Sequence, residues 1–282
     1  MEVKFCNYRQ YPIVLSCRGI IMNVKFLLVD ALNLIRRVYA AQPGEDGPDR
    51  VEGAITATNQ SLQRALREAQ PTHALCVFDS KERGWRHRLF ADYKAGRDPM
   101  PAVLEKGLKK FEESFLQSGV SSFTVAGEEA DDVIATLASK VAAREDHAVI
   151  LSTDKVFIQL LDDFISLHDH FNNRDLDSTY VVNKFGVTTG QFIDFLALAG
   201  DKTNNINGVP SVGPKTAARL LKEIGTLNDI LAVAHTIPGK VGAAIYGHRE
   251  DALLSRSLVS LQRDLSLGVN LKDFRFRGKT IQ

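Results

Sequence analysis

Three short apolar runs, each ending in an aspartate, constrain the fold of this chain more than any other feature. They are residues 25–30 (KFLLVD), 73–79 (HALCVFD) and 147–154 (HAVILSTD). Continuous apolar runs of this length are typical of strands that are buried on both faces, as in a parallel sheet. Helical patterns separate the runs, so the sequence predicts an α/β domain with a mainly parallel sheet flanked by helices.

The remaining pattern divides the chain into segments. Apolar residues at 130, 133, 134, 137, 138 and 141 form the stripe of an amphipathic helix. Residues 52–69 and 103–117 also predict helices, and 121–125 and 164–168 predict weaker strands. From about residue 186 the chain changes to helices and glycine-rich turns. We therefore expect an extension outside the fold at 1–21, an α/β core at 22–185, a helical subdomain at 186–263 and a tail at 264–282.

The aspartates that end the three runs predict a cluster. Ligands of open α/β sheets bind at the carboxyl ends of the strands, where Asp30, Asp79 and Asp154 would meet. Each of them also has an ordinary alternative role, because aspartate after a strand often caps the next helix.

A second acidic group begins the helix that follows Glu129. Glu129 and Asp132 share one helix face, and Asp131 is adjacent. The helix dipole alone favours acidic residues in a first turn, so this pattern too has a structural alternative. Carboxylates that converge on one pocket repel one another unless cations neutralise them, and sites made of oxygen ligands suit Mg²⁺ or Mn²⁺. The two groups together predict a metal site for phosphodiester hydrolysis by a metal-activated water.

A basic segment follows the second run. Residues 81–110 contain nine Lys/Arg and four Asp/Glu, a balance of +5, whereas residues 121–170 contain three and ten, a balance of −7. This contrast is typical of a polyanion held beside a cation site, and equally of two solvated faces. Lys94 and Arg97 are candidates to contact a phosphate, and Tyr93 or Trp85 to stack on an unpaired base.

A second nucleic-acid motif is the glycine-rich stretch GVPSVGPKTAA at residues 208–218. Gly208 and Gly213 would allow the positive φ angles of a tight hairpin, and Pro214 suits the first turn of the next helix. That helix N-terminus, with Lys215 and Thr216, would present backbone amides to a phosphate. The pattern is typical of a helix-hairpin-helix element that binds the DNA backbone.

These motifs resemble those of the 5′ nuclease (flap endonuclease) family, and most closely its stand-alone bacterial group called Xni or exonuclease IX. The matching stretches are LVD at 28–30, VFD at 77–79, YKAGR at 93–97, EADD at 129–132, TDK at 153–155 and the hairpin from Gly208. They cover about residues 22–263 in the family's order. The resemblance implies a PIN-like nuclease core with a basic arch at about 81–110, and a C-terminal helix-hairpin-helix (helix-three-turn-helix) subdomain.

The resemblance also implies roles for individual residues. Lys94, Arg97, Asp30 and Asp79 would be catalytic, and one first metal site would be formed by Asp30, Asp79, Glu129, Asp131, Asp132 and Asp154. A potassium ion at the hairpin would be bound by the carbonyls of Leu198, Ala199, Asn207, Val209 and Val212. The DNA contacts would be Ser211, Val212, Gly213, Pro214, Lys215, Thr216 and Tyr93.

The chain departs from the family pattern at two positions. Val156 and Asn204 stand where the family has carboxylates of a second metal site, and Asp201 remains. We therefore expect one directly bound metal, with Asp131 as its ligand, and a second cation held mostly through water. Asp162, Asp163, His168, Asp169 and His170 are expected to lie in a solvated loop.

The sequence thus predicts a Mg²⁺-dependent endonuclease, with Mn²⁺ able to substitute, that cuts DNA near the junction of a 5′ flap in replication or repair. Two alternatives remain: a branched-DNA-binding protein whose hydrolytic site has decayed, and a ribonuclease of the same architecture. No run approaches the roughly 18 apolar residues of a membrane span. Cys6, Cys17 and Cys76 lack zinc-ligand spacing, and we expect a cytoplasmic monomer.

Overall fold

The computed structural model describes residues 23–278. The expected extension at 1–21 lies outside the described residues. Within them, no helix is long and apolar enough to cross a membrane.

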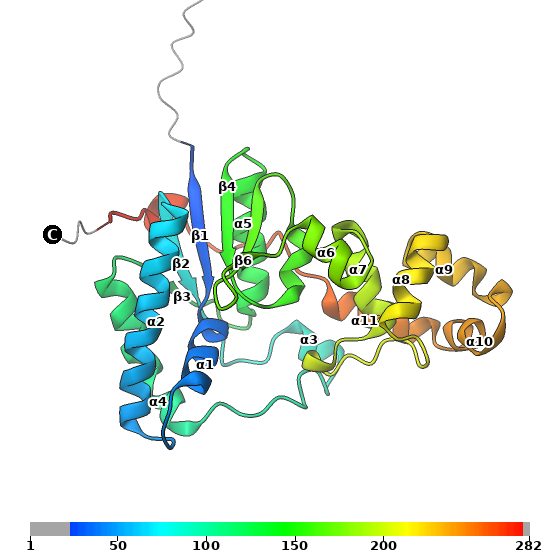
Figure 1. Cartoon of the computed structure of the whole chain (residues 1–282), viewed down its shortest axis with the longest axis horizontal. Coiled ribbons are helices and arrows are strands. Elements are labelled where there is room, and N and C mark those ends of the chain that lie inside the picture. The colour runs from blue at the N-terminus through cyan, green and yellow to red at the C-terminus, as the bar shows by residue number, and fades with distance from the viewer. Residues whose placement is uncertain (1–22, 279–282) are drawn as a thin grey trace, which may run out of the picture.

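A six-stranded sheet forms the centre of the α/β part (Figure 1). Its strand order is β3-β2-β1-β4-β5-β6, and every pairing is parallel except that of β5 with β6. The predicted mainly parallel sheet is confirmed. The strands are β1 (Lys25–Asp30), β2 (His73–Val77), β3 (Ser121–Phe123), β4 (His147–Leu151), β5 (Ile165–Asp169) and β6 (Arg174–Asp175).

Helices cover both faces of this sheet (Figure 1). On one face, Leu27 and Val29 of β1 pack in one core with side chains of α1 (Ala31–Ala41), α2 (Pro48–Ala69) and α4 (Ala102–Gln117). On the other, Phe26 and Leu28 pack against α5 (Ala130–Ala142). Because successive side chains of a strand point to opposite faces, the fully apolar β1 serves two cores. The helix α1 had not been predicted, and the other three had.

The helical subdomain follows β6. The core that contains α5 continues into it through Phe192, Leu198 and Leu220, so the two parts share apolar packing. Its helices are α6 (Ser178–Phe185), α7 (Phe192–Ala199), α8 (Pro214–Glu223), α9 (Leu227–Val233), α10 (Gly239–Gly247) and α11 (Arg249–Val259). Short 3-10 helices lie at Lys155–Leu160, Thr189–Gln191, Lys202–Asn204, Ala234–Thr236 and Leu271–Phe274.

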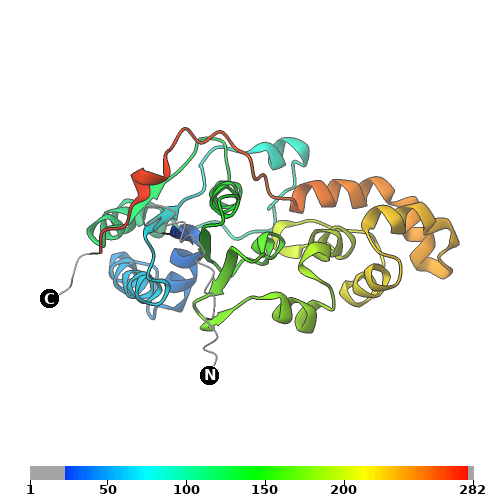
Figure 2. The same cartoon turned by 90° about the horizontal axis from the view of Figure 1, so that it is seen from above.

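After α11 the chain returns to the α/β part as an extended strap, residues 260–276 (Figure 2). The strap runs along α5, where Lys140 donates to the Leu265 carbonyl at 2.9 Å. It ends at the sheet, where Phe274 stacks on Phe26 and the Phe276 N–H donates to the Thr72 carbonyl. The sequence had indicated no structure for 264–282, because this packing depends on residues nearly the whole chain away.

Candidate active site

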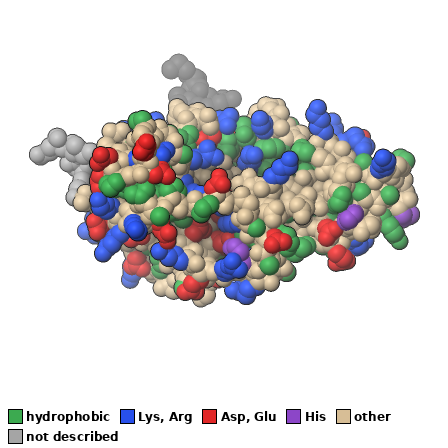
Figure 3. All heavy atoms as spheres, turned by 90° about the horizontal axis from the view of Figure 1, so that it is seen from below, with side chains coloured by type: hydrophobic (Ala, Val, Ile, Leu, Met, Phe, Trp, Pro, Cys, Tyr) green, Lys and Arg blue, Asp and Glu red, His purple; other side chains and the backbone are tan. Residues whose placement is uncertain are grey.

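Four aspartates lie together at the carboxyl edge of the sheet. Asp30 ends β1, and Asp79 and Asp154 follow β2 and β4. Asp131, in the first turn of α5, is close enough to the other three for their charges to act on its carboxyl group. Figure 3 views the molecule from the side to which these strands run, and shows acidic and basic side chains intermixed there.

The capping role proposed for these aspartates is present as well. The Asp30 Oδ1 accepts from the Asn33 N–H at 3.2 Å, and the Asp154 Oδ1 accepts from the Val156 N–H at 2.9 Å. Asp79 instead accepts from the Ala130 N–H, at the start of α5, at 2.8 Å. These bonds fix one oxygen of each carboxylate, so that capping positions the cluster and does not compete with it.

The clustered carboxylates repel one another. Burial raises the pKa of Asp30 to about 7, and the charge of Asp79 adds to that shift. Burial also raises the pKa of Asp131 well above its usual value, and Asp154 and Asp30 raise it further, whereas Lys94 lowers it. A bound cation would relieve this repulsion.

The carboxylate oxygens of the cluster are the donor type that suits a magnesium ion with part of its water shell. Within residues 23–278, no group of three or more Asp, Glu, His or Cys side chains is placed to hold a metal ion by itself. Mg²⁺ does not need one, because it retains several waters and is commonly held by one or two carboxylates. Asp30, Asp79 and Asp154 each accept a backbone hydrogen bond, whereas in the described part of the chain Asp131 accepts none, so Asp131 remains the predicted direct ligand.

Glu129 and Asp132, the other two expected ligands, are already paired. Asp132 is fully buried and binds Arg86 through both oxygens, at 2.7 and 2.8 Å. Glu129 binds Arg86 at 2.7 Å and Lys94 at 3.0 Å. A carboxylate with two cationic or donor partners has little reason to ligate a metal directly, so this geometry does not support that role for either residue.

Lys94 reaches the cluster from the basic segment. Burial works against its charge, but Tyr93, Glu129 and Asp131 outweigh that effect and raise its pKa. Its ammonium group is therefore charged at neutral pH, beside Asp131. Tyr93 was expected to stack on an unpaired base, and this is wrong for the present structure. Its side chain is buried, with its ring against His87 and its hydroxyl 3.3 Å from the Glu129 carboxylate.

Arg97 lies where the basic segment meets the helical subdomain. Its Nη2 donates to the Asn204 Oδ1 at 2.6 Å, and its Nε to the Thr203 carbonyl at 3.2 Å. The Asn204 amide in turn donates to Asp201 at 2.5 Å. The asparagine that replaces a family carboxylate thus serves as donor and acceptor at once. Val156, at the other departure, is half-buried against the apolar core.

The hairpin between α7 and α8 is held by close backbone packing. Gly208 has a φ of +65°, and a Cβ there would lie 2.4 Å from the Gly200 nitrogen and 2.6 Å from the Leu198 oxygen. Gly213 is different from what the sequence indicated. Its φ is −84°, and it caps α8 in an extended conformation, whereas Ser211 has the second positive φ of the hairpin. Of Gly208 and Gly213, therefore, Gly208 is the one whose backbone angles favour glycine.

The expected contact residues lie on this hairpin. Ser211, Gly213, Pro214 and Lys215 are exposed, Thr216 is half-buried and Val212 is buried. Pro214 begins α8 as predicted. Of the carbonyls expected around potassium, that of Leu198 accepts from the Val209 N–H at 2.9 Å, and that of Val209 accepts from Val212 at 3.0 Å. These two hydrogen bonds hold the end of α7 and the hairpin in place beside Ala199 and Asn207.

The expected solvated loop after β4 is only partly one. Asp162 and Asp163 are exposed, but Asp169, at the end of β5, and His170, whose carbonyl accepts from Arg64 of α2 at 3.0 Å, are buried. Asp169 binds Asn172 and Arg174. Within the described residues, neither ring nitrogen of His170 has a hydrogen-bond partner.

Burial of His170 predicts acid sensitivity. Burial, and next the charge of Arg64, lower its pKa to about 4. His168 and Arg37 lower it further, and only Asp169 among these groups acts in the opposite direction. A lowered histidine pKa stabilises the fold above the unfolded value of about 6.5, and this contribution is lost as pH falls toward 4. His170→Leu should therefore reduce the loss of unfolding free energy between pH 7 and pH 4.5 by about 2 kcal/mol. Urea unfolding measures this, with exposed His235→Gln as control; equal losses in all three proteins would contradict it.

The chain was compared with known proteins. A model of the 5′-3′ exonuclease N-terminal resolvase-like domain matches residues 25–186, and a model of the 5′-3′ exonuclease C-terminal SAM fold matches residues 187–282. This chain belongs to the 5′-3′ exonuclease family. The family match confirms the predicted combination of an α/β core with a C-terminal helical part.

Family members with similar sequences carry the name flap endonuclease Xni. The one from Psychromonas ingrahamii is 40% identical over 256 residues, covering 90% of this chain and 98% of that protein. The one from Cronobacter sakazakii is 43% identical over 259 residues, covering 91% and 100%. The predicted resemblance to the 5′ nuclease family is confirmed.

Solved structures of other proteins share the fold. The T5 D15 protein co-crystallised with metal ions has a TM-score of 0.70 at 22% identity, covering 84% of this chain and 90% of that one. The catalytic core of Rad2 in complex with DNA has a TM-score of 0.59 at 11% identity, covering 91% and 83%.

Sequence reasoning missed Arg86 as a site residue. It was counted among the Lys/Arg residues of the basic segment and given no role of its own, yet it is among the most deeply buried side chains of the described structure. The only available signal was its position directly after the aromatic Trp85, which packs on it with 4.4 Å between the guanidinium carbon and the ring centroid.

Proposed function

We propose that this protein is a structure-specific 5′ flap endonuclease, which hydrolyses DNA phosphodiesters near the flap junction in the cytoplasm. One observation carries the proposal: a single joint connects the carboxylate cluster, the basic segment and the hairpin subdomain. At that joint the Lys94 N–H donates to the Asn204 carbonyl at 2.9 Å, while the Lys94 ammonium lies beside Asp131. A phosphate at the cluster and a duplex on the hairpin would therefore be held in fixed register. The names of the relatives, flap endonuclease Xni, support the same function.

Different residues of this chain would have different roles in this reaction. Asp131, with Asp30, Asp79 and Asp154 around it, would hold Mg²⁺ or Mn²⁺, which supplies an activated water and screens the phosphate charge. Lys94 would bind the phosphate and stabilise its added charge during displacement. Arg97 is exposed and uses two N–H groups on the turn at Thr203, so its remaining donors would orient the flap strand.

The hairpin would hold the duplex without reading its sequence. The exposed residues at the start of α8 would contact phosphates, because the helix N-terminus presents unpaired amides. Close packing of Gly208 on Gly200 brings the carbonyls of Leu198, Ala199 and Asn207 near one another, which supports a potassium ion there. We propose that the protein acts as a monomer.

The same joint also favours a second candidate, a non-catalytic protein that binds DNA junctions. Asn204 and Asp201 are hydrogen bonded to each other and to Arg97, so the family's second metal position is filled by protein contacts. The structure supports the enzyme more strongly, since the repulsive cluster around Asp131 lowers stability unless a cation binds.

Cleavage of a labelled 5′-flap DNA tests the two candidates. We expect cutting near the junction in Mg²⁺ and in Mn²⁺, and none in EDTA. Binding with no cutting in either metal would establish the junction-binding protein instead. A matched RNA flap separates the remaining alternative, because a ribonuclease would cut the RNA and leave the DNA intact.

A further inference from the structure

Arg86 is buried beneath the basic segment and uses every N–H of its guanidinium group. Its Nε donates to the Leu258 carbonyl at 2.8 Å, and its Nη2 donates to the Ser260 carbonyl at 2.7 Å and to Asp132 at 2.8 Å. Its Nη1 donates to Glu129 and to Asp132, each at 2.7 Å. Only 2% of the residue is exposed. An arginine with five satisfied donors and two carboxylate partners has a fixed position.

These bonds join three segments that are far apart in the sequence. Trp85 and Arg86 belong to α3 (Trp85–Leu89) of the basic segment, Asp132 belongs to α5, and Ser260 begins the strap. Asp132 also accepts from the Trp85 indole N–H and from the Gln262 N–H, each at 3.0 Å. Arg86 and Asp132 together therefore connect the basic segment, the helix of the acidic cluster and the return of the chain from α11.

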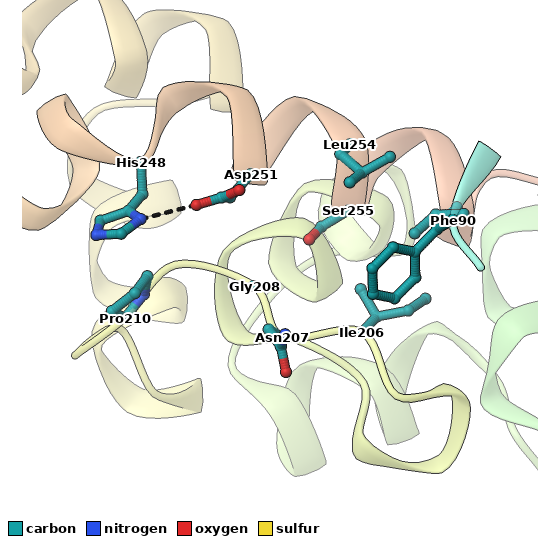
Figure 4. Close-up of a pocket in the computed structure, with 10 residues that line it drawn as sticks. Phe90, Ile206, Asn207, Gly208, Pro210, His248, Asp251, Leu254 and Ser255 are labelled. Carbon is teal, nitrogen blue, oxygen red and sulfur yellow. Dashed lines mark hydrogen bonds and ion pairs between the residues drawn. The ribbon is translucent and has the colours of Figure 1, made fainter. Parts of the chain in front are cut away.

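Apolar contacts beside Arg86 complete this connection. Figure 4 shows Phe90 of the basic segment beside Ile206, below Leu254 and Ser255 of α11. These residues and Leu258 line a cavity of about 290 Å³. Since Arg86 also donates to the Leu258 carbonyl, its hydrogen bonds lie next to the packing between the basic segment and α11.

The hydrogen bonds of Arg86 extend to Lys94 through Glu129. One oxygen of Glu129 binds Arg86, and the other binds Lys94 at 3.0 Å. Burial raises the pKa of Glu129, but Lys94 and Arg86 outweigh burial and lower it. Glu129 is thus a charged bridge, and the position of its Lys94-binding oxygen follows from the position of Arg86.

We propose that Arg86 is a positioning residue for cleavage. Through Glu129 it holds Lys94 where the phosphate would bind. It also neutralises Glu129 and Asp132, so that Asp131 and its neighbours are left to hold the cation. The expected effect of Arg86 on the cleavage rate rests on the proposed nuclease function. The placement of Lys94 by Arg86 does not depend on that function. Lysine cannot replace Arg86 in this role, because a single ammonium group has three donors and no planar fork.

The test uses Arg86→Lys and the double variant Arg86→Met/Asp132→Leu. Removing both charges of a buried pair avoids the unpaired charge that a single truncation leaves, so the double variant should fold. Arg144→Met is the control, because Arg144 is exposed, follows the C-terminal end of α5 and lies outside the basic segment. Both Arg86 variants should lower kcat for the 5′ flap at least tenfold with KM changed less than twofold, whereas Arg144→Met should change neither. A double variant with both the kcat and the Tm of the wild type would overturn the proposal, since a merely structural role of Arg86 predicts that result.

A second measurement keeps the inference independent of activity. Acetylation of lysines in the intact protein, followed by mass spectrometry, reports how well Lys94 is held, with exposed Lys109 as internal reference. Relative to Lys109, Lys94 should react at least threefold faster in the double variant than in the wild type. Equal rates would show that Arg86 does not place Lys94, even if the wild-type protein proved to cut nothing. Absence of cutting with faster Lys94 acetylation would instead refute only the nuclease function.

Discussion

Asp131→Asn is expected to lower the rate of flap cleavage by roughly a thousandfold while making the metal-free protein more stable. The rate falls because the substitution removes the most available metal-ligating charge, and with it most of the electrostatic stabilisation of the reacting phosphate. Stability rises because Asp154 and Asp30 no longer repel a buried carboxylate at this position, as they do in the wild type. Single-turnover cleavage in Mg²⁺ and thermal unfolding in EDTA at pH 8 measure the two effects.

Exposed Asp163→Asn serves as the matched control, because it removes the same charge outside the cluster. It should leave both the rate and the melting temperature near the wild-type values. The added stability of Asp131→Asn should also disappear in Mg²⁺, since a ligand that binds only the folded protein stabilises the wild type by mass action. A variant that still cuts within tenfold of the wild-type rate would show that Asp131 is not the direct ligand.

Gly208→Ala is expected to disrupt the hairpin and weaken duplex binding by at least roughly tenfold, which corresponds to about 1.4 kcal/mol. A methyl group at Gly208 would meet the backbone of Gly200 and Leu198 at 2.4 and 2.6 Å, and the φ of +65° is unfavourable for alanine. Backbone atoms cannot move aside as a flexible side chain can. The two turns must separate, and with them the carbonyls expected around potassium.

Gly213→Ala, in the same hairpin, provides a sharp comparison. Its φ is −84°, and a Cβ there would have no other atom within 4 Å. We expect duplex affinity within about twofold of wild type for this variant. Titration of a fluorescent duplex in KCl measures both. Equal affinities of the two variants would contradict the role assigned to Gly208.

The role of the basic segment is one result that the sequence did not anticipate. Its charge was expected either to contact DNA or to form a solvated face, yet Arg86 and Tyr93 are buried and Lys94 is partly covered. Their partners are Glu129 and Asp132, more than 30 positions away in the chain. The positive charge of the segment therefore serves in part to neutralise acidic residues of the protein itself.

Local sequence patterns predicted five of the six strands, three of the helices that cover the sheet and the gathering of the strand-end aspartates, but not β6. These follow from local patterns: apolar runs that need burial on both faces, the spacing of amphipathic helices, and the shared edge at which parallel strands end. Pro214 at the start of α8 is local in the same way, since its ring fixes φ and it has no N–H to satisfy.

Long-range packing separates the charges that face the acidic cluster from those that are used in packing. Asp131 and Asp132 are neighbours with the same side chain, yet one carboxylate lies open to the cluster and the other is enclosed by Arg86 and Trp85. No local pattern separates them, because the energy of a buried charge depends on the partners that long-range folding brings to it. The strap after α11 could not be predicted from the sequence for the same reason. Its hydrogen bonds are to α5, Arg86 and the sheet, and they form only when those elements have packed.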